Sequence, residues 1–342
     1  MSRNNTAGRA GTTTAAADPA SSPAGTPAPR RALLRGLPWV VWHRHRTLLR
    51  IGLLATLAGC ALFAYQRIGV LDFLHGKGAA PDGDGRLLDQ FQSSFGPMFS
   101  RDLQFMEGLP FLIGVFLGAP LIAGEREHGT IRLVTTQSVS RGRWIAAALG
   151  LPLAVAAVCT ALLSAAFTWL WSPAHDLVGG GDWLQSGAFD STGPVPVAKT
   201  LFLTACGIAL GMLAKRVVPA MAATAVFGFA FSVVWSERVR DRLGTLRSLS
   251  YPYDGDGPPM PPSSVRIDDW VSTADGRLYG YGTCVNGDTE ACRAKLGIVN
   301  RVTQYFDYGQ MPGMQWLGAG ILLALTAAVL ALVVWRAHRR PL

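Results

Sequence analysis

Residues 124–144, GEREHGTIRLVTTQSVSRGRW, form a polar and basic stretch between two long apolar runs. Glu125 and Glu127 can pair with basic residues of another chain, and complementary charges of this kind orient a partner at an interface. Gly129 and Thr130 suit a chain turn followed by a helix cap. These residue types predict a docking surface, not a catalytic centre.

The basic residues that end the same segment have two interpretations. In the first, Arg141 and Arg143 lie near lipid headgroups beside a docked partner. In the second, the segment is a solvated loop whose arginines only follow the excess of basic residues on the cytoplasmic side of membrane proteins. Residue type and spacing leave both interpretations open.

Motifs for enzymatic chemistry are absent from the sequence. It contains no G-x-x-x-x-G-K-[ST] phosphate loop, no H-E-x-x-H and no paired C-x-x-C, and its six histidines are dispersed. We therefore expect no catalytic residue, no metal, no cofactor and no nucleic-acid partner. Apart from Arg50 and Glu107 near span ends and Lys199 at a span edge, the apolar runs lack ionisable residues, which argues against coupling to an ion gradient.

The apolar runs predict the elements that hold the 124–144 loop. Hydrophobic residues make up 49% of the chain and charged residues 15%, against about 25% charged in a typical soluble domain. Roughly 17–25 apolar residues of helix cross a bilayer. We predict an all-α polytopic membrane protein with six transmembrane helices, at residues 49–66, 106–123, 145–171, 197–213, 217–235 and 315–335.

The distribution of charge predicts the orientation of these helices. Six spans place both termini on one side, together with the 124–144 loop, Lys215, Arg216 and the basic end RAHRR. Basic residues outnumber acidic ones on that side, which is typical of the cytoplasm. We expect cytoplasmic N- and C-termini.

The remaining segments divide into tails and loops. Residues 1–30 are rich in Ala, Thr, Ser, Gly and Pro and predict a disordered cytoplasmic tail. Residues 31–48 mix Arg with Trp and predict an interfacial helix, although these basic residues can also serve only to set topology. On the outer side, residues 85–105 suit a surface helix and residues 172–196 an irregular Gly-rich loop.

Residues 236–314, between the fifth and sixth spans, predict a small α+β extracellular cap. The segment ERVRDRLGTLRSL suits an amphipathic helix, and WVSTA and RLYGY flank Asp275 and Gly276, a turn typical of a hairpin. Cys284 and Cys292 lie in this cap, where an oxidising compartment permits a disulfide. Residues 315–342 then form the last span and the basic end.

Two small-xxx-small patterns occur within the spans, GVFLG at residues 114–118 and GIALG at residues 207–211. Such patterns let helices approach closely. We interpret them as packing within one chain; a seam between two copies is the alternative.

The 124–144 segment resembles the loop of bacterial ABC transporter permease subunits of the type-2 superfamily, which reads approximately E-x-E-x-G-T-x-R-L followed by T-Q-S-V-x-R-x-R-W. The matching residues are Glu125, Glu127, Gly129, Thr130, Arg132, Leu133, Thr136, Gln137, Ser138, Val139, Arg141, Arg143 and Trp144. The stretches FDSTGPVPVAKTLF and GMLAKRVVPAMAATAVF are also similar to family segments. Thr135 and Ala148 depart from the family pattern.

This resemblance implies a six-helix permease subunit without ATPase activity of its own, in a bacterial plasma membrane. It would pair with a second permease, as a homo- or heterodimer, and with cytoplasmic ABC ATPase subunits that touch the Glu-containing loop, to which Arg132 and Gln137 belong. Such assemblies usually export amphipathic or lipid-like molecules.

Two other classes of function compete with a permease. A membrane sensor or accessory protein would bind a ligand at the extracellular cap and signal through the loop. A secondary carrier would need an ion gradient, which the uncharged spans disfavour. Neither class accounts for the motif of residues 124–144, and the sequence does not identify a cargo.

Overall fold

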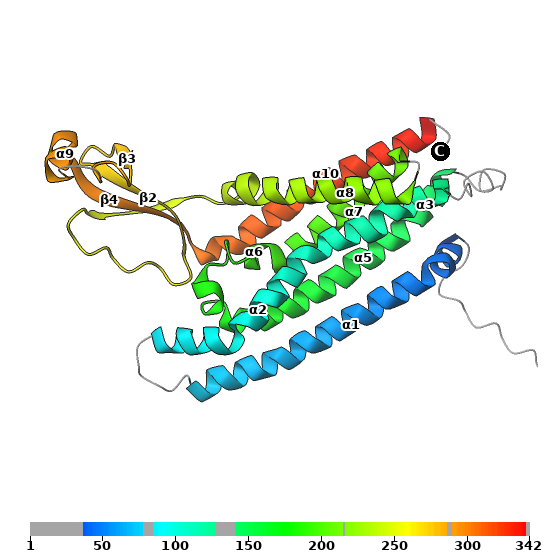
Figure 1. Cartoon of the computed structure of the whole chain (residues 1–342), viewed down its shortest axis with the longest axis horizontal. Helices are drawn as coiled ribbons and strands as arrows, with labels where there is room; N and C mark the ends of the chain where they lie inside the picture. Colours follow the sequence, from blue (N-terminus) through cyan, green and yellow to red (C-terminus); the bar gives the residue numbers. More distant parts are fainter. Residues whose placement is uncertain (1–36, 78–84, 128–140, 215, 286–288, 340–342) are drawn as a thin grey trace, which may run out of the picture. The chain divides into compact units, whose positions relative to one another are not determined.

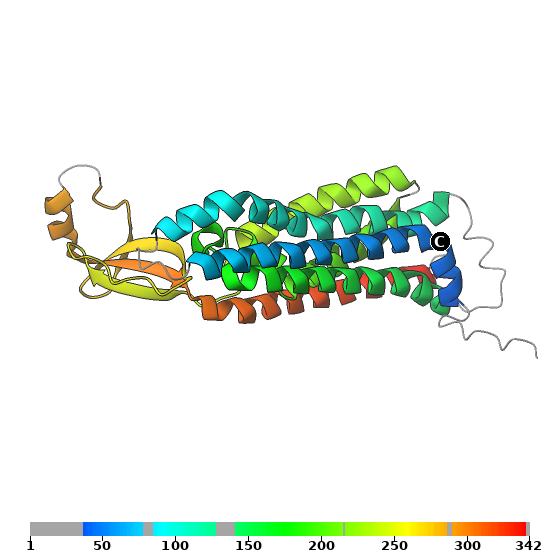
Figure 2. The same ribbon diagram turned by 90° about the horizontal axis from the view of Figure 1, so that it is seen from below.

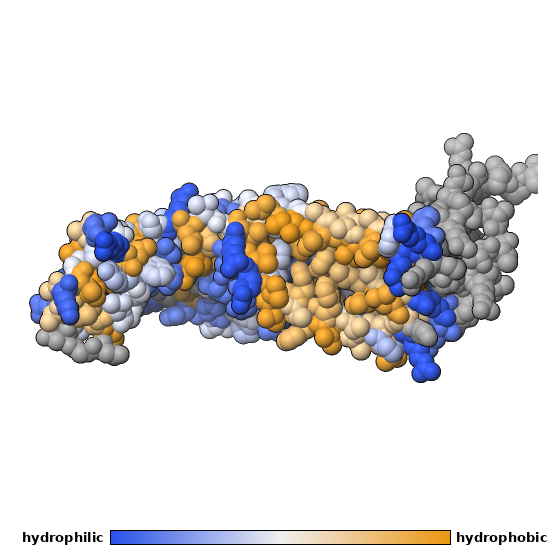
Figure 3. All heavy atoms as spheres, turned by 90° about the horizontal axis from the view of Figure 1, so that it is seen from above, coloured by the Kyte–Doolittle hydropathy of each residue, from blue (hydrophilic) through white to orange (hydrophobic). Residues whose placement is uncertain are grey.

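The computed structural model describes residues 37–77, 85–127, 141–214, 216–285 and 289–339. Six helical segments in these ranges are long and apolar enough to cross a membrane: Leu49–Gly76, Arg86–Glu127, Leu149–Ala174, Val195–Leu213, Val217–Arg242 and Tyr308–Arg339. The six predicted spans are thereby confirmed. Figure 3 shows an apolar band over the helical part on the face that it draws, with hydrophilic residues at either side.

Figure 1 shows how the helices follow one another along the chain. The α-helices that contribute to the six spans are α1 (Leu37–Lys77), α2 (Gly85–Ile113), α3 (Ala119–Glu127), α5 (Arg141–Trp171), α7 (Val195–Leu213), α8 (Val217–Val234) and α10 (Met311–Arg339). Helix α1 is continuous from within the predicted interfacial helix into the first span. Residues 1–36, which include the predicted tail, lie outside the described residues.

The second span is one helical run with local irregularities. A π-helical turn, η1 (Gly114–Gly118), connects α2 to α3. Pro97 and Pro110 lie inside α2, where each removes a backbone hydrogen bond and favours a bend. The helix expected at residues 85–105 is present as the first part of this run.

The helix α7 lies at the centre of the bundle. In its most apolar window 72% of residues are buried, against 11% for the span of α1. Thr200 and Thr204 donate their hydroxyls to the carbonyls four residues earlier, at 2.8 and 2.6 Å, so that these side chains need no other partner. Figure 2 shows the long helices running side by side.

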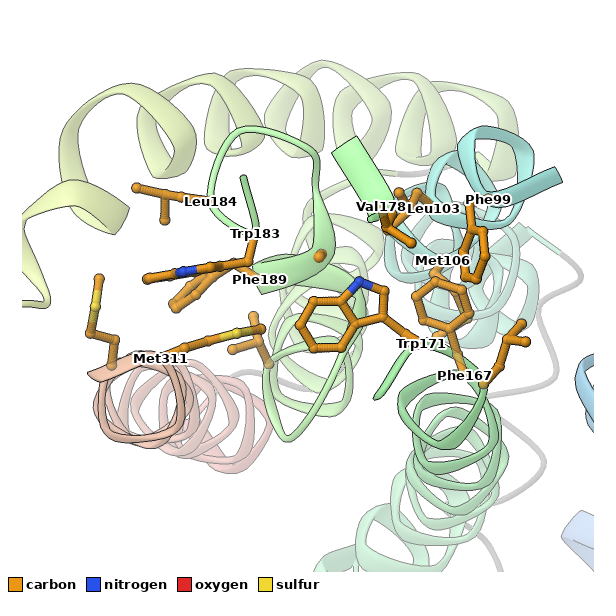
Figure 4. Packing of buried hydrophobic residues seen from close by; sticks show 14 of the residues in the cluster. Phe99, Leu103, Met106, Phe167, Trp171, Val178, Trp183, Leu184, Phe189 and Met311 are labelled. Atoms are coloured by element: carbon orange, nitrogen blue, oxygen red, sulfur yellow. The ribbon is translucent and has the colours of Figure 1, made fainter. Parts of the chain in front are cut away.

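Residues 172–193, which we call the inserted segment, differ from the predicted irregular loop. They form the short helices η2 (Ser172–Ala174), η3 (Val178–Gly181) and α6 (Ala188–Ser191), which contact α2, α5 and α7. Trp183, Leu184 and Phe189 are almost wholly buried and pack among core residues of the bundle (Figure 4). Apolar burial therefore holds this segment inside the bundle, although its Gly-rich and acidic composition predicted a solvated loop.

The cap contains an antiparallel sheet of strand order β1-β4-β2-β3. The strands are β1 (Arg247–Pro252), β2 (Val265–Thr273), β3 (Leu278–Gly280) and β4 (Ile298–Phe306), with α9 (Thr289–Leu296) before the last. The predicted hairpin is confirmed: β2 pairs with β3, and Gly276 occupies the left-handed region of the turn at φ +84°.

The amphipathic helix predicted for ERVRDRLGTLRSL is present only in its first half, residues 237–242. The end of α8 continues through a π-helical turn, η4 (Trp235–Val239), and one 3-10 turn, η5 (Arg240–Arg242), and the last residues of the stretch already belong to β1. Pairing of β1 with β4 outweighs the helical periodicity, because it satisfies the backbone groups of both strands.

Cys284 and Cys292 form a disulfide that links the end of the hairpin to α9. Cys284 is buried and packs with Val271 and Ile298. The three other cysteines, Cys60, Cys159 and Cys206, are free.

This disulfide gives a labelling experiment. In intact cells a membrane-impermeant maleimide should not label the native chain, whereas Cys284→Ser should expose the thiol of Cys292 and become labelled. Cys159→Ser, which changes a buried thiol of the bundle, is the control and should stay unlabelled. Labelling of the native chain at both cap cysteines would contradict the disulfide.

Candidate functional site

The end of α3, where the predicted docking loop begins, is hydrogen-bonded to the turn between α7 and α8. Arg126 donates from Nη1 to the carbonyl oxygen of Met212, near the end of α7. Glu127 accepts from the backbone N–H of Val217, the first residue of α8, at 2.8 Å from Oε2. We call these two bonds the α3 clamp.

The α3 clamp satisfies backbone groups that a helix leaves unpaired. The last carbonyls of one helix and the first N–H groups of the next have no partner inside their own helices. The charges also match the partial charges of the helix ends, since a cation favours a C-terminus and an anion an N-terminus. One short stretch of α3 therefore binds both sides of the α7–α8 hairpin.

The residues predicted to dock a partner lie before, within and after residues 128–140, which the structure does not describe. Glu125 and Glu127 belong to α3, and Arg141 and Arg143 to the first turn of α5, whose side chains there are outside the described part. Gly129, Thr130, Arg132 and Gln137 also lie outside the described residues. The structure thus brings the beginning of the loop to the α7–α8 hairpin and leaves its middle undescribed.

The two small-xxx-small patterns contact each other within the chain. A Cβ atom added at Gly207 of α7 would lie 2.6 Å from the carbonyl oxygen of Gly114 in η1, and one at Gly118 would lie 2.6 Å from that of Thr204. A Cβ atom added at Gly211 would lie 2.6 Å from the carbonyl oxygen of Ala119. These are backbone contacts, which no side-chain rotation can relieve, so the predicted packing within one chain is confirmed.

The π-helical turn lies at this contact. Such a turn inserts one residue into an α-helix, and π-turns occur frequently at functional sites. Here it spans the GVFLG pattern and is followed immediately by α3 and the clamp. These close backbone approaches at the glycines, which we call the glycine contact, and the α3 clamp therefore join the η1–α3 run to the second half of α7.

A buried group of charged residues, which we call the ionic cluster, lies where α6, α7 and the end of α8 meet. Asp190 is 2.9 Å from Lys199 and 3.6 Å from Arg240, and it accepts from the indole Nε1 of Trp235 at 2.7 Å. Side-chain exposure is 3% for Asp190, 12% for Lys199 and 7% for Arg240. Removing one partner from such a buried group typically costs about 3–5 kcal/mol.

The ionic cluster corrects the expectation that the bundle lacks ionisable residues beyond Arg50, Glu107 and Lys199. Arg240 extends the fifth span, and Asp102 is a buried carboxylate in the second. Asp190 was missed because the inserted segment was predicted to lie outside the bundle. In the sequence, Lys199 at a span edge was the one signal of a buried acidic partner.

Among the cavities lined by the described residues, two bear on what the bundle can hold. The first, of about 450 Å³, lies between α1, the α2–η1 run and α5, with walls of apolar residues such as Leu109, Ile113 and Leu163, together with Thr56 and Thr160. The second, of about 390 Å³, lies between α2 and the inserted segment and has both polar and aromatic walls. In the described ranges, no three His, Cys, Asp or Glu residues come together as metal ligands.

A family model described as ABC-2 membrane transporter related matches residues 53–240. The chain belongs to this family. Searches of curated proteins and of solved structures returned no match. Together with the six helices, membership identifies a multi-pass membrane permease of the ABC-2 type.

The matched region of this ABC-2 permease contains the α3 clamp, the inserted segment and the ionic cluster. It runs from residue 53 within α1 through the 124–144 segment, the inserted segment and the α7–α8 hairpin to Arg240 of the ionic cluster. The cap and α10 lie beyond it. The α3 clamp, the cavity beside the inserted segment and most of the wall of the apolar cavity therefore belong to the part of the chain that the family shares.

The glycine contact gives a stability prediction. Gly207→Ala should destabilise the ABC-2 permease by about 1–3 kcal/mol, because the added methyl overpacks a backbone contact. Gly320→Ala on α10, where an added Cβ meets nothing within 4 Å, is the control and should be neutral or slightly stabilising. Thermal unfolding in detergent measures both, and equal midpoints for the two variants would contradict the contact.

Proposed function

We propose that this chain is the membrane-spanning subunit of an ABC exporter in a bacterial plasma membrane, and that a separate cytoplasmic ATPase drives it. The observation that carries the proposal is the α3 clamp. A partner that binds the 124–144 loop pulls on α3, and the clamp passes that movement to α7 and α8. The loop alone could be a topogenic segment, but its attachment to the central hairpin supports a mechanical role.

We base the proposed orientation on the distribution of basic residues, which indicates that both termini and the 124–144 loop lie in the cytoplasm. The ATPase then meets the loop, and the cap with its disulfide faces the oxidising side. The chain itself is proposed to have no enzymatic activity, since ATP hydrolysis is assigned to the partner.

The cargo proposed is an amphipathic or lipid-like small molecule. The apolar cavity between α1, the α2–η1 run and α5 supports this class, because its lining is suited to an alkyl or aromatic body and not to a polar solute. A second permease, either another copy or a sister chain, is proposed to complete the pathway.

A charge reversal in the loop tests the ATPase partnership. Arg132→Glu should abolish recovery of a Walker-type ATPase when the tagged chain is purified from its native membranes in mild detergent. Lys295→Glu, the same reversal on exposed α9 of the cap, should leave recovery unchanged. Bound proteins are identified by mass spectrometry and ATP hydrolysis is assayed in each eluate.

The outcomes of this purification separate the permease from a sensor. Loss of the ATPase in Arg132→Glu alone supports docking at the loop. Absence of any ATPase from the native sample, across several detergents, would overturn the proposed partnership.

A further inference from the structure

The cavity between α2 and the inserted segment presents a polar stripe inside a membrane protein. One face of α2 carries its polar groups at helical spacing, and the inserted segment adds one hydroxyl: Gln92, Ser100, Gln104, Glu107 and Ser186. Phe99, Leu103 and Val178 supply apolar wall on the same cavity and lie close together in Figure 4. A wall that is apolar on one side and polar on the other matches a ligand with both kinds of surface.

Glu107 is the charged member of this stripe, and its side chain is exposed to the cavity. Among the residues that the structure describes, its carboxylate has no hydrogen-bond or ion-pair partner. The charges of Lys199 and Arg240 act on Glu107 from a distance, but both side chains make their ion pairs with Asp190. Glu107 is therefore open to a ligand, whereas Asp190 is occupied within the protein.

The backbone opposite Glu107 leaves room for this carboxylate. Gly187 adopts φ +86°, and a Cβ atom there would lie 2.8 Å from Oε1 of Glu107. A side chain at this position would displace the carboxylate. An ionisable group in a membrane span costs about 2.5–3.5 kcal/mol on insertion scales, and such groups mark substrate pathways by default.

We propose that this cavity binds the protonated amine of an amphipathic cargo, with Glu107 as the counter-ion. The ammonium donates to the Glu107 carboxylate and to the amide oxygens of Gln92 or Gln104, while the apolar body lies against Phe99, Leu103 and Val178. This inference rests on the proposed function, because it names the class of molecule that the permease carries. Charge-assisted hydrogen bonds of this kind are about twice as strong as neutral ones.

Binding to the permease alone, in lipid nanodiscs, tests the proposal without the ATPase. The probes are tritiated octylammonium and tritiated octanol, which share one alkyl chain and differ in the charged head, and empty nanodiscs give the partition background. Glu107→Gln should weaken octylammonium binding by about tenfold or more, as expected for a lost charge-assisted hydrogen bond, and should leave octanol binding unchanged. Glu237→Gln, an exposed carboxylate outside the cavity, is the matched control and should alter neither.

A second variant tests the location independently of the charge. Ser100→Phe adds bulk to the α2 wall of the cavity and should reduce binding of both probes. Unchanged octylammonium binding in Glu107→Gln, or an equal loss of both probes in that variant with its unfolding midpoint retained, would overturn the counter-ion role. Unchanged binding in Ser100→Phe would overturn the cavity as the site. A failure here leaves ATPase recovery intact, so it is distinguishable from a failure of the proposed function.

Discussion

The close contact between the glycine face of α7 and the η1–α3 run is the constraint on which the rest of the bundle depends. Backbone approaches at Gly114, Gly118, Gly207 and Gly211 leave no room for side chains. Apolar side chains gain little from contact with each other when lipid is the alternative, so such close packing is what holds membrane helices in place. The central helix α7 is fixed by it, and α8, α10 and the inserted segment pack around α7.

This contact and the α3 clamp together hold α3 against the α7–α8 hairpin. Met212 and Val217 lie at the two sides of one short turn, and Arg126 and Glu127 bind both from a single helix end. Because α3 is also packed along α7, we expect a displacement of the 124–144 loop to move the hairpin as a body. The ionic cluster holds the opposite end of α7 to the inserted segment and to the end of α8.

Hydropathy and turn chemistry predicted the spans and the β2–β3 hairpin, since both depend on local sequence. The glycine patterns predicted close packing, but they could not say that GVFLG would meet GIALG, because pairing is a tertiary property. Asp190 was missed for a related reason: its burial depends on Trp183 and Phe189 of the same segment entering the bundle. Arg126 was overlooked because an arginine beside a loop that is predicted to be cytoplasmic is also what topology alone requires.

The most direct test of the account is whether ATPase-driven movement reaches α8 through the α3 clamp. Spin labels at Ile51→Cys on α1 and Val218→Cys on α8, both exposed positions, report their separation in the complex with and without ADP–vanadate. The account predicts a change of distance in the otherwise native chain and in the cap variant Asp275→Asn/Arg277→Gln, and little or none in Arg126→Gln/Glu127→Gln. An equal change in the clamp variant, with the ATPase still bound, would show that movement reaches α8 by another route.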